Sequence, residues 1–206
     1  MNNVYTDIND NPWGYVVKNN ILGFLSGPLS QWFGGYANQN YPFKMSVSDC
    51  TSIYHGDGYI RFLDRYDQPH NEYFITFNTA EQAMMFGKAI LFEDFDIADK
   101  ILETKDPRVQ KQLGRAIKNY VEEEWAEIRL DWVTQLNCAK FSQHEDLKNF
   151  LVNTCKNYIL CEASPVDRIW GIGYATKDEE TFNVTSWKGQ NLLGRALMRV
   201  REKLTY

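Results

Sequence analysis

Apolar residues recur at helical spacing along most of the chain beyond residue 78. Their spacing of three and four predicts helices over about 79–92 and 94–103, one beginning after Asp106, and others over about 125–136, 147–151 and 192–200. Thr79 with Gln82 fits a capping box. Asp106 followed by Pro107 fits an N-cap with proline at the first helical position. The buried stripe of that helix is expected at Val109, Leu113, Ala116 and Ile117.

Short alternating runs in the first third of the chain predict strands instead. The runs 59–63 and 72–77 read as two strands around the polar turn 64–71, and 158–162 reads as a further short strand. We find no internal repeat and no flexible linker. The pattern therefore predicts an α+β fold, a helix-rich single domain over residues 1–206 with a small antiparallel sheet from the N-terminal third.

Composition narrows the function classes. The 206 residues are 44% hydrophobic and 15% aromatic, and no run approaches 18 apolar residues, so an ordered core without a membrane span is expected. The first residues resemble no secretory signal. Four cysteines without C-x-x-C spacing predict reduced thiols and a cytoplasmic location. A net charge of −5 argues against a long phosphate-tracking surface but permits a pocket for one nucleotide.

The run from Glu162 to Gly173 concentrates charged and aromatic residues in one constrained loop. Pro165 favours extended geometry before it, and Gly171 and Gly173 permit a close backbone approach. Asp167, Arg168 and Trp170 are presented from this loop, where binding and catalytic residues tend to lie. The alternative is that these side chains only fasten the loop to the core.

Glu81 and Lys88 stand seven residues apart on the helix after Asn78, at the edge of its apolar stripe. They differ by only about 20° in direction and by roughly 10 Å along the axis. That spacing is too long for a routine ion pair on a helix surface. Both side chains can instead reach one small ligand, although two ordinary surface charges would give the same pattern.

Other catalytic motifs are missing from the sequence. There is no phosphate-binding G-x-x-x-x-G-K-[ST] motif and no H-E-x-x-H motif, and Ser164 lacks a G-x-S-x-G setting. The three histidines, His55, His70 and His144, are scattered. We therefore expect neither a metal nor another cofactor, and assign any chemistry to carboxylates and lysine.

Several motifs in a fixed order resemble the NADAR (NAD and ADP-ribose) or YbiA-like family. They lie at 27–33, 77–89, 104–115, Trp125, 137–143, 162–173 and 187–194. The resemblance covers about residues 24–204, and the stretch 34–72 is longer and more aromatic than the connector typical of the family. It implies a helix-rich α+β fold and N-glycosidase chemistry on ribosides.

Two substrate classes follow from the resemblance. One is ADP-ribose attached to guanine, as a small molecule or in nucleic acid, and the other is the amino-pyrimidine ribosyl phosphates of early riboflavin synthesis. A module that binds ADP-ribose or NAD without catalysis is the alternative from a different class. The matching catalytic positions are Glu81, Lys88 and Asp167. The matching substrate-binding positions are Ser30, Trp32, Arg115, Trp125, Lys140, Glu162, Arg168, Trp170 and Asn191.

Breaking a ribose C1–N bond develops positive charge on the ring and negative charge on the base. Glu81 and Asp167 can serve as the carboxylate pair. Lys88 can bind phosphate, donate a proton, or attack C1 as a nucleophile, which requires a lowered pKa. Because an ion pair with Glu81 would raise that pKa, the nucleophilic role depends on burial. Trp170 or Trp32 is the expected stacking platform for the base.

Overall fold

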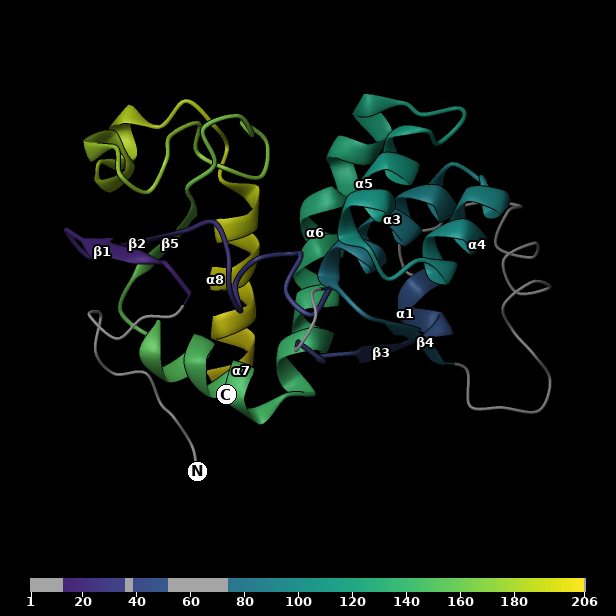
Figure 1. The fold of residues 1–206 in the computed structure, drawn as a ribbon, viewed down its shortest axis with the longest axis horizontal. Coiled ribbons are helices and arrows are strands. Elements are labelled where there is room, and N and C mark those ends of the chain that lie inside the picture. Colours follow the sequence, from purple (N-terminus) through teal and green to yellow (C-terminus); the bar gives the residue numbers. More distant parts are fainter. Residues whose placement is uncertain (1–12, 36–38, 52–73, 206) are drawn as a thin grey trace. The chain divides into compact units, whose positions relative to one another are not determined.

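The computed structural model of the chain describes residues 13–35, 39–51 and 74–205 (Figure 1). The chain forms two compact units. We call Gly34–Lys140 the central unit, and Met1–Phe33 with Phe141–Tyr206 the terminal unit. Each is described by itself.

The central unit combines a two-stranded sheet with a group of helices. Strands β3 (Phe43–Ser46) and β4 (Phe74–Phe77) pair antiparallel, with Phe43 opposite Phe77. The short helix α1 (Val47–Thr51) follows β3. The predicted strand 72–77 is thus confirmed over its last four residues. Its expected partner, the run 59–63, lies outside the described residues. In the structure, β4 pairs with β3.

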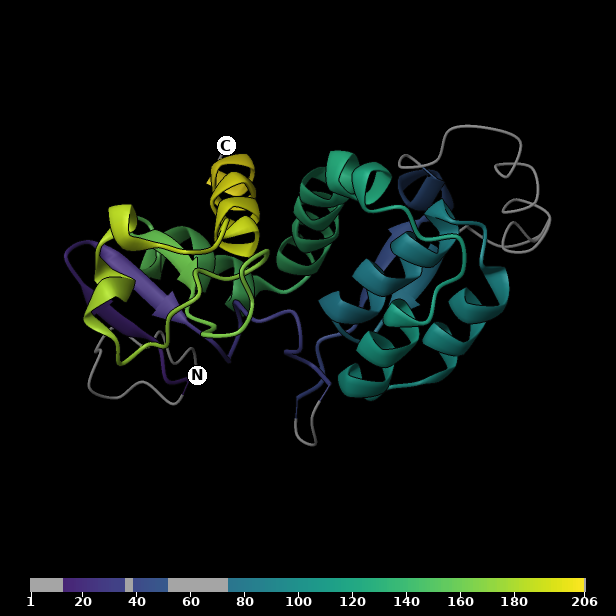
Figure 2. The ribbon, with the colours of Figure 1, turned by 90° about the horizontal axis from the view of Figure 1, so that it is seen from above.

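Helix α3 (Ala80–Leu91) forms the core of the central unit, and α4 (Phe95–Glu103) and α5 (Pro107–Arg115) pack against it (Figure 1, Figure 2). Every residue of α3 except Lys88 and Leu91 is buried. The predicted N-cap is confirmed, because Thr79 Oγ1 accepts from the backbone N–H of Gln82 at 2.9 Å. The Gln82 side chain accepts from Asn78 N rather than from the cap residue, so the capping box is extended by one residue.

Helix α6 (Glu122–Ser142) approaches α3 closely at Gly87. A Cβ atom there would lie 2.3 Å from the indole of Trp132, whose Nε1 donates to Ala83 O at 3.2 Å. Helix α5 approaches α3 in the same way, since a Cβ on Gly114 would meet Met85 Sδ at 1.9 Å. Glycine therefore permits both helices to pack directly on α3.

The predicted buried stripe of α5 is confirmed only at Ile117, which is 7% exposed and lies just beyond the end of the helix. The buried residues of the helix itself are Pro107, Gln110 and Gly114, whereas Val109 is 38% exposed. The Gln110 amide donates to Asn78 Oδ1 at 2.9 Å and to a backbone carbonyl, and accepts from a threonine hydroxyl. A buried amide with its hydrogen bonds satisfied occupies the face where an apolar stripe was expected.

The terminal unit contains a mixed sheet in the order β1-β2-β5. Strand β1 (Val16–Lys18) is antiparallel to β2 (Ile21–Phe24), and β2 is parallel to β5 (Ile159–Glu162). The predicted strand 158–162 is confirmed, whereas β1 and β2 were not predicted.

Helices and short helical turns complete the terminal unit. Helix α7 (Glu145–Asn149) continues into the π-helix η2 (Phe150–Thr154), and two 3-10 turns, η3 (Glu179–Phe182) and η4 (Val184–Ser186), precede the last helix. That helix, α8 (Leu192–Thr205), packs on β5 and η2. Its apolar stripe is buried as predicted.

The α+β, helix-rich fold class is confirmed, and a single domain over residues 1–206 stays a prediction. No helix within the described ranges is long and apolar enough to cross a bilayer.

Candidate active site

Lys88, near the end of α3, lies in a partly buried setting. Its Nζ donates to Gly114 O at 3.0 Å and lies 3.8 Å from the centroid of the Tyr120 ring. Burial lowers the pKa of Lys88 most strongly, and the nearby positive charge of Arg115 lowers it further. The carboxylate that raises this pKa belongs to Glu122. The amine therefore has a local counter-charge that the sequence did not indicate.

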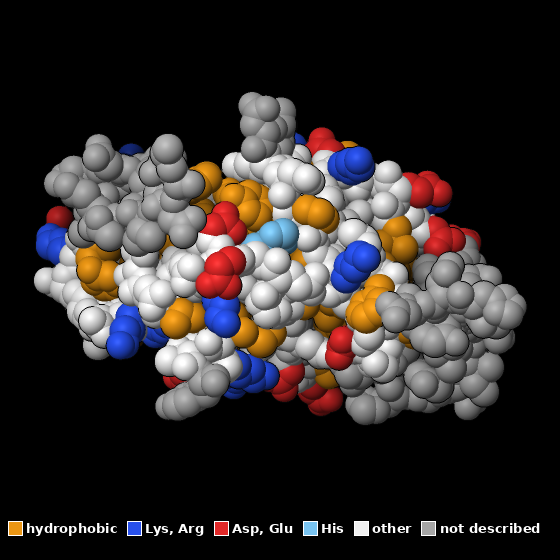
Figure 3. Space-filling model, turned by 90° about the horizontal axis from the view of Figure 1, so that it is seen from below, with side chains coloured by type: hydrophobic (Ala, Val, Ile, Leu, Met, Phe, Trp, Pro, Cys, Tyr) orange, Lys and Arg blue, Asp and Glu red, His pale blue; other side chains and the backbone are white. Residues whose placement is uncertain are grey.

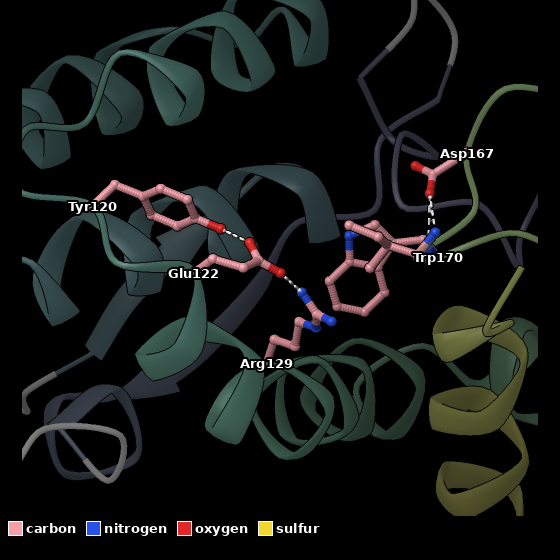
Figure 4. A network of polar contacts seen from close by, with 6 residues as sticks. Tyr120, Glu122, Arg129, Asp167 and Trp170 are labelled. Carbon is pink, nitrogen blue, oxygen red and sulfur yellow. Dashed lines mark hydrogen bonds and ion pairs between the residues drawn. The ribbon is translucent and has the colours of Figure 1, made fainter.

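Two neighbours hold Glu122 in place (Figure 4). The Tyr120 hydroxyl donates to one carboxylate oxygen, and Arg129 Nη1 donates to the other at 2.7 Å. The Tyr120 hydrogen bond is the main reason why the pKa of Glu122 is lowered. Burial, followed by the bond to Glu122, raises the pKa of Tyr120 to about 12. The carboxylate is therefore held as an anion.

Glu81 lies in the first turn of α3 and is only 3% exposed. It is therefore buried rather than at the edge of a stripe. Negative charge is favoured at a helix N-terminus, where backbone N–H groups point outward. Next to it, Gln82 Nε2 donates to Ile101 O at 2.8 Å and to Thr104 O at 3.1 Å. This anchorage fixes the turn that carries Glu81.

Trp125 and Lys140 both lie on α6. Trp125 is 5% exposed and Lys140 is 1% exposed. Burial lowers the pKa of Lys140 to about 7. Fifteen residues of helix separate them by roughly 22 Å along the axis. The two predicted ligand contacts therefore lie far apart on the helix that carries both.

Asp167 in the terminal unit organises the loop that carries it (Figure 4). Its Oδ1 accepts from the backbone N–H groups of Ile169 at 2.9 Å and Trp170 at 2.8 Å. The Ser164 hydroxyl accepts from the N–H of Asp167 at 3.2 Å. One carboxylate oxygen thus fixes the backbone from which the half-buried Trp170 extends.

Gly171 lets this loop close on itself. A Cβ atom there would lie 2.9 Å from both Glu162 O and Asp167 O. The expected close approach is therefore to the loop's own backbone. The loop also caps α8, because Leu192 N and Leu193 N donate to the carbonyls of Ile169 and Trp170.

Asn191 joins α8 to the sheet. Its buried side chain accepts from Glu162 N at 3.1 Å and donates to Leu160 O at 2.9 Å. These bonds extend the hydrogen-bonding pattern of β5, so the amide serves the fold. Earlier in the chain, Ser30 Oγ accepts from Trp32 N at 3.2 Å and holds the backbone of the half-buried Trp32.

The structure brings together Lys88 with Arg115 and Asp167 with Trp170. Arg168 is exposed beside the latter pair, and its carbonyl accepts from Gln190 N at 2.8 Å. Glu81 belongs to the central unit and Asp167 to the terminal unit, so their pairing stays a prediction.

Sequence reasoning missed Tyr120, Glu122 and Arg129. Glu122 and Arg129 are seven residues apart, the same spacing that is too long for a routine ion pair between Glu81 and Lys88 on a helix surface. They form one because Glu122 is the first residue of α6 and the arginine side chain is long. An acidic helix start followed by arginine two turns later was the available signal.

A family model described as the NADAR domain matches residues 37–205. An N-glycosidase of Acanthamoeba polyphaga mimivirus is 40% identical over 65% of this chain and 78% of that protein. The protein irg-1 of Caenorhabditis elegans is 38% identical over 67% of this chain and 66% of that protein. The NMR structure of the E. coli protein YbiA is similar in fold, with a TM-score of 0.59 and 22% identity over 92% of this chain and 88% of that one.

Two relatives that are less similar than the viral one carry names from riboflavin biosynthesis. Those of Arabidopsis thaliana and Vibrio vulnificus are 28% and 30% identical over 53% and 58% of this chain, which spans only 17% and 29% of their lengths.

Proposed function

Because the chain belongs to the NADAR domain family, we propose that it is an N-glycosidase, a hydrolase that breaks the bond between ribose C1 and nitrogen. The similarity to the viral N-glycosidase, 40% identical over 78% of that protein, carries this proposal. A single family model that matches residues of both units also supports one domain over the matched residues 37–205.

The substrate we propose is ADP-ribose attached to guanine. Lys88 and Arg115 supply two positive charges close enough to affect one another, as recognition of a phosphate-bearing ligand requires. The net charge of −5 favours a local contact with the modified nucleotide over a long nucleic-acid surface, and basic and acidic side chains are interspersed on the face in Figure 3. The relatives with riboflavin names are less similar to this chain than the viral N-glycosidase is.

Those names nevertheless support a second candidate, the amino-pyrimidine ribosyl phosphates of riboflavin synthesis. Both candidates contain a ribose C1–N bond and phosphate, so the same residue chemistry serves either.

In the hydrolytic route, water supplies the oxygen that bonds to C1, and its proton goes to the departing nitrogen. The Glu81 carboxylate, buried at a helix N-terminus, activates that water or stabilises the positive ring. Asp167 has the complementary carboxylate role. Lys88 stabilises or protonates the departing base, and Trp170 or Trp32 stacks on it.

In the covalent route, the Lys88 amine displaces the base at C1. A C1=N bond to lysine forms, one amine proton goes to the base and the other to the opened ring oxygen, and water then releases the sugar. Burial lowers the pKa of Lys88, and this supports the route because a free amine is the nucleophile.

The test is incubation of the protein with ADP-ribosylated guanosine and, separately, with the amino-pyrimidine ribosyl phosphates, followed by chromatography. We expect ADP-ribose and guanosine from the first substrate. Turnover of only the second would favour the riboflavin candidate. Tight binding of ADP-ribose without product from either would identify a non-catalytic module.

A further inference from the structure

The geometry around Lys88 points to a residue outside the family motifs that acts through this lysine. We propose that Glu122, held by Tyr120 and Arg129, is a positioning residue whose negative charge sets the protonation of the Lys88 amine. The inference rests on the proposed function, in which Lys88 works at the riboside, and adds the group that controls it.

The contacts form a chain within the central unit. The Lys88 amine lies over the Tyr120 ring, 3.8 Å from its centroid. The hydroxyl of that ring donates to Glu122, whose other oxygen accepts from Arg129 at 2.7 Å (Figure 4). One tyrosine therefore contacts both the amine and the carboxylate.

The Arg129 and Glu122 side chains differ in how deeply they are buried. The Arg129 side chain is 7% exposed whereas that of Glu122 is 50% exposed. Arginine thus anchors the carboxylate from the buried side, and the same carboxylate still raises the pKa of Lys88.

Burial lowers the pKa of the amine most, and charge repulsion from Arg115 lowers it further. Against these, Glu122, the face of the Tyr120 ring and the Gly114 carbonyl, which accepts the amine's hydrogen bond at 3.0 Å, favour the charged form. Because burial and Arg115 would remain, the pKa must fall when the charge of Glu122 is removed.

Removal of the Glu122 charge should move the pH dependence of activity in the same direction for either route of the reaction. If Lys88 acts protonated, activity is lost as pH rises through its pKa, and a lower pKa moves that loss to lower pH. If it acts as a free amine, activity appears as pH rises through its pKa, and the gain also moves to lower pH.

The test is the pH dependence of acetylation of Lys88 when the folded, full-length protein is treated with acetic anhydride. The protein is then digested, and mass spectrometry of the peptide that contains Lys88 measures the label. Only the free amine reacts, and no substrate is needed. In Glu122→Gln, which keeps the size of the side chain, we expect the labelling midpoint to fall by about half a pH unit or more.

Glu124→Gln is the matched control. It removes the same charge from the same helical turn, and Glu124 is exposed. Its midpoint should equal that of the wild-type protein. An unchanged midpoint in a folded Glu122→Gln protein, or an equal fall in Glu124→Gln, would overturn the inference.

A second variant covers the case in which Glu122→Gln does not fold. Tyr120→Phe keeps the ring over the amine but removes the hydroxyl that holds the carboxylate, so its midpoint should fall by less; no fall would count against Glu122. On a confirmed riboside, the Lys88-dependent limb of the kcat/KM profile must move to lower pH in Glu122→Gln. Failure to cleave any riboside tests the proposed function instead, since labelling does not depend on turnover.

Discussion

Replacement of Gly87 by alanine should destabilise the protein, although alanine is the better helix former. The new Cβ would lie 2.3 Å from the indole of Trp132, and ordinary carbon contacts begin near about 3.5 Å. The indole must therefore move by about 1 Å. Trp132 is fully buried, and its Nε1 donates to Ala83 O, so movement strains both its packing and this hydrogen bond.

Two contributions of the Gly87→Ala substitution destabilise the fold and one stabilises it. Overpacking costs about 1–3 kcal/mol, and loss of the indole hydrogen bond about 0.5–1.5 kcal/mol. Alanine gains about 1 kcal/mol over glycine inside a helix. The net loss is about 0.5–3.5 kcal/mol, and a central value of about 2 kcal/mol lowers Tm by about 4–8 °C in a chain of this size.

Thermal and urea unfolding of the wild type, Gly87→Ala, Trp132→Phe and the double variant measure this as a cycle. The smaller phenyl ring makes room for the methyl group, so Gly87→Ala should cost less in the Trp132→Phe background. An equal cost in both backgrounds, or a rise in Tm for Gly87→Ala, would refute the steric argument.

Substitutions at three further residues test the site and the fold that supports it. Glu81→Gln should keep the fold, judged by circular dichroism, but lower turnover of a confirmed riboside by at least about two orders of magnitude, as loss of a working carboxylate should; near wild-type rates would remove its role. Lys88→Ala should be severely impaired in turnover. Borohydride added during turnover should trap a substrate adduct on Lys88 only if the covalent route operates, and Lys88→Arg should then be inactive. Asn191→Ala should lower the free energy of unfolding by about 1–3 kcal/mol, because Glu162 N and Leu160 O lose their partner; unchanged urea unfolding would contradict this.

Local signals along the chain predicted much of the fold. Thr79, Asp106 and the stripe of α8 act through neighbours within a few residues, so helix starts and the buried face of α8 are readable from the sequence. The family motifs also predicted Glu81, Lys88 and Asp167 as catalytic residues, and these three stay predictions.

What the sequence could not decide depends on partners far along the chain. The buried face of α5 is set by bonds from Gln110 to Asn78 and Thr104, and no apolar period reports those. The surroundings of Lys88 likewise come from residues 26 to 34 positions later: the Gly114 carbonyl, the Tyr120 ring and the Glu122 charge. The sequence by itself thus determined the candidate groups for chemistry, whereas the tertiary structure decided which charges surround the lysine, because desolvation and Coulomb energy depend on distance in space and not on spacing in the chain.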